Sequence, residues 1–265
     1  MKLIRLATVA TLSTVILAGG FKTVSAQEVR DVTTDGQVEF RPAGEDDDAL
    51  EVINPEKDPE APDVDINPEM PGTTGPLSIV KAAWMDFGTQ VISNQDQVYN
   101  MVAEMQQLTG TEGDENKVPY VSFAQVQDLR GTNEGWNLKV SLDDFTSNTQ
   151  NNVLTGAEIA LLSPRIQYEG VTTENAPIAH SDGLRLIPGA GSVSVMRAPE
   201  GHGAGASSVV WGNQADLNAQ FIDDEVEIVT NNAIKLSVPG STAKDATTYT
   251  STLTWELSAT PGDDA

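Results

Sequence analysis

The residues able to do acid, base or nucleophilic chemistry are few in this chain of 265 residues, which has two histidines and no cysteine. Without cysteine there is no thiol nucleophile, no disulfide and no thiolate ligand for zinc or an iron–sulfur cluster. His202 lies in a glycine-rich loop before Ser207 and Ser208, but without the strand, Gly-x-Ser-x-Gly and helix sequence that presents a serine nucleophile. His180 lies in a turn-like stretch. The histidines therefore predict neither a catalytic triad nor a three-histidine metal centre, and we expect no cofactor.

Pairs of carboxylates could also be catalytic, because glycoside hydrolases act with two of them. Asp143 and Asp144 follow one stretch with strand alternation, and the triplet at 223–225 comes before another. Adjacent side chains of a strand point to opposite faces, so neither group forms a catalytic pair by itself. The acidic run at 45–48 lacks the alternating spacing and the glycine of a calcium loop. We therefore expect no enzyme, no catalytic residues and no metal ligands, and we keep a glycosidase as the third-ranked alternative.

The overall charge narrows the choice of partners. Fifteen Lys and Arg residues stand against 39 Asp and Glu residues, which gives a formal net charge of -24 and an isoelectric point near 4.1. Such a chain repels a polyanion, because nucleic-acid binding draws on basic residues that neutralise phosphates. We therefore expect no nucleic-acid partner.

The first 26 residues have the composition of a secretory signal. Lys2 and Arg5 precede an apolar stretch at 6–21, and the small residues at 24–26 suit cleavage after Ala26. A membrane anchor is the alternative, but the stretch is shorter than the roughly 20 residues that span a bilayer. No later segment is apolar enough to cross, and no sorting motif is read at 261–265. We expect an exported, secreted protein that does not span the membrane and is held at the surface non-covalently.

Residues 27–75 differ in composition from the rest of the chain. The acidic run at 45–48 is followed by prolines at 55, 59, 62 and 68 among further acids. Charge repulsion and the missing backbone donors disfavour a packed core. We predict an acidic, Pro-rich, disordered linker that ends in a turn-rich stretch at 71–76. An acidic arm that binds a basic partner or divalent cations is the alternative.

From residue 76 onward, short stretches rich in Val, Ile, Thr and aromatic residues alternate with Gly, Asn, Asp and Pro. This pattern is typical of an all-β domain, an antiparallel β-sandwich or barrel of many short strands. The stretch 98–108 also fits a helical spacing, but its neighbours favour a strand. We predict strands at 120–127, 136–142, 157–162, 193–197, 207–211, 225–230, 234–238 and 248–258.

Two predicted strands, far apart in the chain, share the pattern Trp-x-Leu on one apolar face. Trp136 and Leu138 begin the first, and Trp255 and Leu257 lie in the second. One interpretation is core packing, in which each indole N–H needs an internal acceptor. The other is a carbohydrate platform, in which sugar C–H faces stack on exposed indoles, with Trp84 and Trp211 as further candidates. Spacing alone does not separate the two interpretations.

Further short stretches accompany the two Trp-x-Leu segments in a fixed order. They are 77–80, 86–88, 91–93, 121–131 running into 135–140, 186–189, 238–240 and the closing stretch 249–261. With these features, residues 76–265 resemble the WxL-domain surface proteins of low-GC Gram-positive bacteria. The paired motifs, with the second near the C-terminal end, carry most of the resemblance.

The resemblance implies a module that binds non-covalently to the cell wall, through peptidoglycan, with Trp136, Leu138, Trp255 and Leu257 as the ligand-binding positions. It also implies partners, namely a membrane-anchored WxL-interacting protein and other WxL proteins. The second hypothesis is accordingly an interaction subunit that docks on such a protein, and the third a wall-active glycosidase. Removal of residues 1–26 leaves a charge of -27, which is repelled by teichoic acid phosphates. We therefore expect wall binding to depend on stacking, hydrogen bonds or bridging cations, and little on salt.

Overall fold

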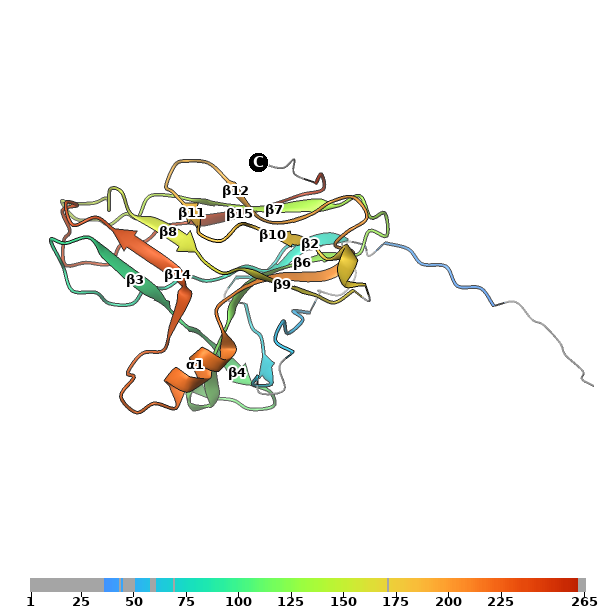
Figure 1. Ribbon diagram of the computed structural model, residues 1–265, viewed down its shortest axis with the longest axis horizontal. Helices are drawn as coiled ribbons and strands as arrows, with labels where there is room; N and C mark the ends of the chain where they lie inside the picture. Colours follow the sequence, from blue (N-terminus) through green and yellow to red (C-terminus); the bar gives the residue numbers. More distant parts are fainter. Residues whose placement is uncertain are drawn as a thin grey trace, which may run out of the picture. The chain divides into compact units, whose positions relative to one another are not determined.

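The computed structural model describes residues 36–42, 44, 51–57, 61–68, 70–170 and 172–261. The predicted signal peptide at 1–26 and the acidic run at 45–48 lie outside the described residues. The regular secondary structure of the described part is mainly antiparallel β-strand, with one α-helix and long connecting loops (Figure 1). The predicted all-β fold is confirmed.

Four antiparallel sheets make up the described fold. The sheet that carries both Trp-x-Leu segments, here called the motif sheet, has the order β10 (Ile178–Ala179), β12 (Val193–Ala198), β7 (Trp136–Leu142) and β15 (Leu253–Ser258). The central sheet has the order β2 (Leu77–Lys81), β6 (Ser122–Asp128), β13 (Gly205–Trp211) and β9 (Arg165–Tyr168). The lateral sheet has the order β11 (Leu184–Leu186), β8 (Glu158–Leu161), β14 (Thr230–Val238) and β3 (Gln97–Val102). The small sheet consists of β1 (Val64–Asp65), β4 (Glu104–Leu108) and β5 (Lys117–Tyr120).

The main core lies between the motif sheet on one side and the central and lateral sheets on the other (Figure 1). Inward-facing residues of all three sheets belong to one apolar cluster, as expected when strand side chains alternate between faces. This is the two-layer packing of a β-sandwich. Its fully buried members include Trp136, Leu138, Val140, Ile159, Leu161, Val195, Met196, Val209, Trp211 and Ile234.

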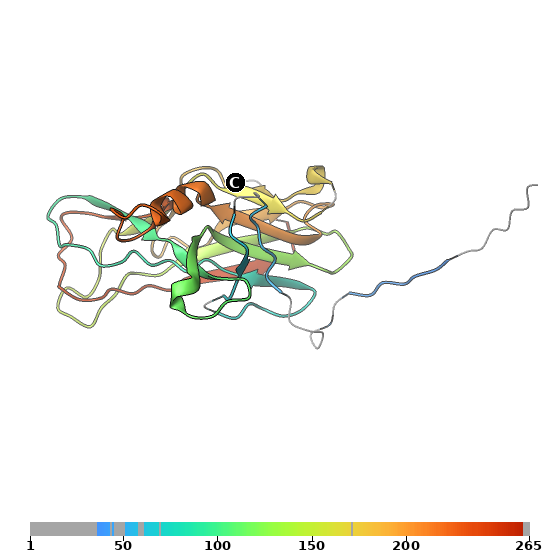
Figure 2. The same ribbon diagram turned by 90° about the horizontal axis from the view of Figure 1, so that it is seen from below.

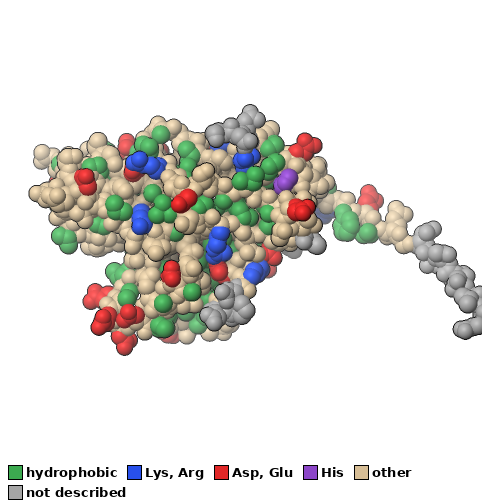
Figure 3. Space-filling view, in the orientation of Figure 1, with side chains coloured by type: hydrophobic (Ala, Val, Ile, Leu, Met, Phe, Trp, Pro, Cys, Tyr) green, Lys and Arg blue, Asp and Glu red, His purple; other side chains and the backbone are tan. Residues whose placement is uncertain are grey.

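A second, smaller core covers the outer face of the central sheet. The small sheet and helix α1 (Gln214–Phe221) pack there through Val64, Tyr120 and Leu217, which meet Phe123 of β6, and Figure 2 shows this lobe from below. Every residue of β6 is buried, because the strand is covered on both faces. Acidic side chains gather at the lower end of the lobe in Figure 3.

The same interface contains a buried ion pair. Lys81 Nζ lies 2.7 Å from the Glu104 carboxylate, and only 2 % and 9 % of the two side chains are exposed. The ammonium group also lies 4.4 Å from the centre of the Phe123 ring. A buried charge is tolerated only when it is paired, so this pair fixes how the small sheet sits on the central sheet.

Within the segment expected to be a disordered linker, residues of 51–57 and 61–68 make contacts with the domain. Gln125 of β6 makes two hydrogen bonds with the backbone of Ile53, and Gln127 donates to the Glu51 carbonyl oxygen at 2.8 Å. Val64 forms part of the second core and its strand β1 pairs with β4. The composition of this segment shows only its charge and its prolines. Its backbone groups are instead bound by glutamines of β6, which is distant in sequence. The boundary at residue 75 stays a prediction.

Two local predictions have different outcomes. The stretch 98–108 forms strands β3 and β4, as predicted. Residues 225–229 form no strand, and the described chain instead has α1 just before them. Asn213 caps this helix by accepting from the Asp216 backbone N–H, and Gln214 is bound to both Val121 and Pro119. The helix is thus held by its cap and by polar contacts with its neighbours, which an apolar pattern does not reveal.

Candidate functional site

The two Trp-x-Leu segments form one structural unit. Strands β7 and β15 are antiparallel neighbours in the motif sheet, although more than one hundred residues separate them in sequence. Leu257 lies directly opposite Leu138, and Trp255 lies opposite Val140. Both tryptophans belong to or pack against the main core. Each copy of the motif therefore contributes one strand to the same apolar face of the motif sheet.

Trp136 and Leu138 are fully buried, with 0 % of either residue exposed. The indole Nε1–H of Trp136 donates to the Gly203 carbonyl oxygen at 3.1 Å, so the only polar atom of the ring is satisfied internally. Gly203 has φ +73°, and a Cβ at this position would lie 2.7 Å from Trp136 Nε1. The glycine-rich loop containing His202 therefore closes over Trp136, and only a glycine allows so close an approach.

Trp255 and Leu257 are half-buried, because β15 is the outer strand of the motif sheet. The ring of Trp255 lies 6.5 Å from that of Trp211, which comes from the central sheet and is fully buried. Trp211 in turn stacks on His180 with ring centroids 5.9 Å apart and an interplanar angle of 28°. The three rings form an aromatic row that joins the two layers of the sandwich.

His180 is held in one neutral form by its hydrogen bonds. Its Nε2 accepts from Trp211 Nε1–H at 2.9 Å, and its Nδ1 lies 2.7 Å from the Ser181 carbonyl oxygen, to which it must donate. Burial lowers the pKa of His180 below 6.5, opposed in part by the Ser181 carbonyl and by Asp182. Protonation of Nε2 would place two N–H donors against each other, so His180 serves as a structural acceptor for Trp211.

The positions of the four motif residues bear on the two interpretations of Trp-x-Leu. Core packing accounts for every contact of Trp136 and Leu138 given above, since neither side chain reaches the surface. Trp255 and Leu257 keep partial access to solvent. Of the further candidates, Trp211 is buried and Trp84 is 55 % exposed. Direct ligand contact by the four motif residues stays a prediction.

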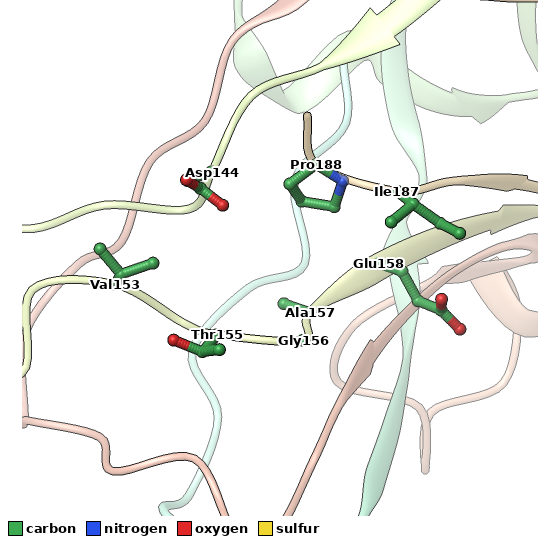
Figure 4. A pocket seen from close by; sticks show the side chains of 8 residues that line it. All are labelled: Asp144, Val153, Thr155, Gly156, Ala157, Glu158, Ile187 and Pro188. Carbon is green, nitrogen blue, oxygen red and sulfur yellow. The ribbon is translucent and has the colours of Figure 1, made fainter. Parts of the chain in front are cut away.

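A groove, here called the end groove, lies where the two motif strands meet the loops at one end of the sandwich. It consists of two hollows of about 510 and about 320 Å³ that share Asp144. The larger is lined by Asp143, Asp144, Thr146, Gly189, Thr250, Ser251 and Thr252. The smaller is lined by Asp144, Val153, Thr155, Gly156, Ala157, Glu158, Ile187 and Pro188, and Figure 4 shows their side chains around the opening.

The walls of the end groove lie directly beyond the paired ends of the two motif strands. Asp143 directly follows β7 and Thr252 directly precedes β15, and the Asp143 backbone N–H donates to the Thr252 carbonyl oxygen at 3.0 Å. Further along, Thr146 and Thr250 exchange backbone hydrogen bonds of 2.7 and 2.9 Å. Ser251 Oγ donates to the Asp143 carbonyl oxygen at 2.6 Å. The groove wall is therefore held by backbone hydrogen bonds just past the end of the β7–β15 ladder, where Thr146 and Thr250 form an isolated bridge.

The lining of the end groove is acidic and rich in hydroxyl groups. Asp143 and Asp144 are exposed, and Glu158 forms an ion pair with Arg185. Neither hollow is lined by Lys or Arg. Across the described residues, no group of three or more His, Asp or Glu side chains is arranged to hold a metal ion. The described helices also include none that is long and apolar enough to cross a bilayer.

Sequence reasoning had noted Asp143 and Asp144 only as an unpaired acidic doublet. It gave no reason to join them to Thr250 and Thr252, because the loops that follow and precede the motif strands are distant in sequence. The register of β7 with β15 contained the signal, since two strands that pair antiparallel bring the end of one to the start of the other.

Comparison with known proteins gives one match. A profile of the family described as "WxL domain surface cell wall-binding" matches residues 27–261, which covers most of the chain and both Trp-x-Leu segments. Neither the comparison with curated proteins nor that with solved structures found a match.

Proposed function

The chain belongs to the family of WxL domain surface cell wall-binding proteins, and from this membership we propose that it is an exported protein that attaches non-covalently to the peptidoglycan of a Gram-positive cell wall. The family match over residues 27–261 carries the proposal and supports attachment at the cell surface. The chemistry of the wall ligand is inferred from charge, as follows.

The charge of the protein favours a neutral ligand over an anionic one. The chain without residues 1–26 has a formal charge of -27, and the end groove adds local carboxylates without a lysine or arginine on its lining. Coulomb repulsion opposes the approach of teichoic acid phosphates, most strongly at low ionic strength. Glycan strands and stem peptides offer hydroxyl and amide groups that a negative surface can bind through hydrogen bonds.

The proposal is for a binding protein without catalytic activity. A glycosidase needs a pair of carboxylates, one of which is kept protonated by burial. Asp143 and Asp144 are exposed to solvent, and Glu158 is neutralised by Arg185. This arrangement supports adhesion to a wall polymer and gives no reason to expect bond cleavage. Zymography on gels containing cell walls checks this point directly.

A binding assay on purified cell walls tests the proposed function. Purified chain is mixed with Gram-positive sacculi that retain their teichoic acids and with sacculi from which these polymers have been stripped, and the bound fraction is measured by sedimentation. Between about 0.1 and about 1 M salt the Debye length falls from about 10 to about 3 Å. We expect binding to both preparations, equal or stronger on the stripped sacculi, with little change as salt rises.

Two results would contradict the proposal. Loss of binding on stripped sacculi would identify teichoic acid as the ligand, and steep release by salt would show that charge attraction holds the protein. Docking on a membrane-anchored WxL-interacting protein stays a separate prediction. It requires binding to membranes carrying that protein, whereas the proposed function requires binding to sacculi with no protein partner present.

A further inference from the structure

We propose that the end groove is the ligand site of this domain, and that it binds an uncharged, polyhydroxylated sugar chain, the glycan strand of the wall. The inference rests on the proposed function and deepens it, because it assigns the contact to particular residues away from the Trp-x-Leu segments. It follows from the chemistry of the lining, the apolar flank, the size of the hollows and the rigidity of the walls.

The lining matches the hydrogen bonds that sugars offer. A carboxylate is an acceptor with two oxygens, and a hydroxyl both donates and accepts. Asp143 and Asp144 are exposed on the groove, beside the hydroxyl residues Thr146, Thr250 and Thr252. Hydrogen bonds to a charged group are the stronger kind, at about 1.5–3 kcal/mol each. Sugar hydroxyls donating to Asp144, which borders both hollows, are therefore the expected central contact.

One flank of the groove is apolar. Ile187 is 47 % exposed and Pro188 follows it on this flank, while Val153 lies across the opening on the lining of the smaller hollow. Figure 4 shows these three side chains around the same opening as Asp144. Sugar rings and N-acetyl methyl groups present C–H surfaces, which gain free energy when they leave water. The smaller hollow thus offers apolar contacts interspersed with polar groups, a combination that small-molecule sites also show.

The size of the groove suits consecutive units of a chain. Each hollow, at about 510 and about 320 Å³, falls within the range of about 300–1,000 Å³ found for sites of small ligands. The two share a wall residue, so an extended polymer can occupy both in succession. A single small molecule would leave one of them unfilled.

The rigidity of the walls links the groove to the buried tryptophans. Binding costs less when the site is already formed, because fewer side chains and loops must be ordered. The groove walls are held by backbone hydrogen bonds from Asp143 to Thr252 and between Thr146 and Thr250. Those bonds lie just past the end of the β7–β15 ladder, whose inner face Trp136 and Trp255 anchor in the core. The Trp-x-Leu segments thus hold the end groove in position, and the end groove binds the bacterial cell wall.

The charge of the groove also selects against the other wall polymers. Glu158 is paired with Arg185, but Asp144 borders both hollows and Asp143 borders the larger one, so the carboxylates of these two residues repel a phosphate polymer. The carboxylates of the groove would attract an ammonium group of a stem peptide. Such a group would bind through the negative charge alone and would make no use of the apolar flank. The presence of both features favours the sugar chain, and the test below separates the two.

Point variants with matched controls test the assignment. Asp144→Ala and Ile187→Ala alter the end groove, while Asp224→Ala and Ile222→Ala remove the same side chains from exposed positions after α1. The probe is a soluble glycan strand freed of its stem peptides by an amidase, with stem peptides and polyglycerol phosphate as further arms, and affinity is measured by calorimetry. Melting temperature and circular dichroism of each variant verify the fold.

The expected result is a loss of glycan affinity of about tenfold or more for Asp144→Ala, a smaller loss for Ile187→Ala, and none for the two controls. Asp144→Asn keeps an acceptor oxygen, so it retains more affinity than Asp144→Ala. Equal loss in both Asp144 variants, with binding to stem peptides, would reassign the groove to an ammonium ligand. Unchanged binding of folded Asp144→Ala and Ile187→Ala to sacculi and glycan would overturn the site and leave the proposed function intact. If the unaltered chain binds no sacculi, the proposed function fails.

Discussion

The two Trp-x-Leu strands have the same residue pattern but different surroundings. Strand β7 has a neighbour on each side, β12 and β15, whereas β15 forms the outer edge of the described motif sheet. Trp136 is consequently sealed from solvent and bonded to Gly203, while Trp255 is half-buried and contacts Trp211 at its ring. Alternation decides which face a side chain takes, and the place of the strand within the sheet decides how deeply it is buried.

This difference assigns two kinds of role within one motif. The inner copy works as a core anchor, and a small neighbour, Ala198, lies opposite Trp136 on β12 and leaves room for the indole. The outer copy connects the motif sheet to the central sheet through the aromatic row of Trp255, Trp211 and His180. Variants at the two copies should therefore differ in their effect on stability.

The largest effect is expected for Trp136→Ala. Removing a fully buried indole leaves a cavity and deletes its hydrogen bond, a loss of about 3–5 kcal/mol in the free energy of unfolding. Trp255→Ala removes a half-buried ring and should cost about 2 kcal/mol. Urea unfolding followed by circular dichroism measures both. Equal losses for the two variants would show that edge and interior positions of the motif sheet do not differ as described.

A second, smaller effect concerns the loop that covers Trp136. Gly203→Ala forces a methyl group to within 2.7 Å of Trp136 Nε1 at φ +73°, while Gly201→Ala, at φ +84°, has no atom within 4 Å of the added carbon. Both variants bear the backbone strain of a left-handed residue, about 1–2 kcal/mol, and only Gly203→Ala adds the clash. We expect Gly203→Ala to be clearly less stable in thermal unfolding. Similar melting temperatures for the two variants would mean that the loop does not seal the indole.

The smallest expected effect is a pH dependence of stability that comes from His180, the last ring of the aromatic row that contains Trp255. The pKa of His180 is lowered by burial from 6.5 in the folded protein, so the unfolded chain binds the proton more readily. Its contribution to stability is therefore complete above pH 6.5 and is lost as the pH falls below that value. His180→Gln keeps an acceptor for Trp211 without titrating, and should lessen the acid-side decline by on the order of 1 kcal/mol, about one hydrogen bond.

His202→Gln is the matched control for this third prediction, because His202 lies in the loop over Trp136 and contacts no tryptophan nitrogen in the described structure. It removes an imidazole without removing a partner of Trp211, so only His180→Gln tests the Trp211–His180 contact. Denaturant unfolding at several pH values above and below 6.5 supplies the measurement. An unchanged decline in His180→Gln would show that other groups, such as the many carboxylates, cause it.

Several elements could be predicted from sequence because local pattern and burial agree. The alternation of β7 is strict, and all its apolar positions are buried, although the polar Asn137 is buried as well. Other elements escaped prediction because their partners are remote. The segment at 51–57 packs through glutamines of β6, and α1 is held by Gln214 and its cap rather than by an apolar stripe. Polar side chains that serve as backbone partners carry no periodic signal.

The sequence by itself determined the all-β class, the two apolar strand faces and the negative charge, because these follow from alternation and composition. Only the tertiary structure decided that the two Trp-x-Leu strands are neighbours, that Trp136 is sealed and Trp255 is not, and that Asp143 and Thr252 share a groove wall. Pairing between strands more than one hundred residues apart depends on the packing of the whole sandwich. Local residue preferences contain no information about that choice of partner.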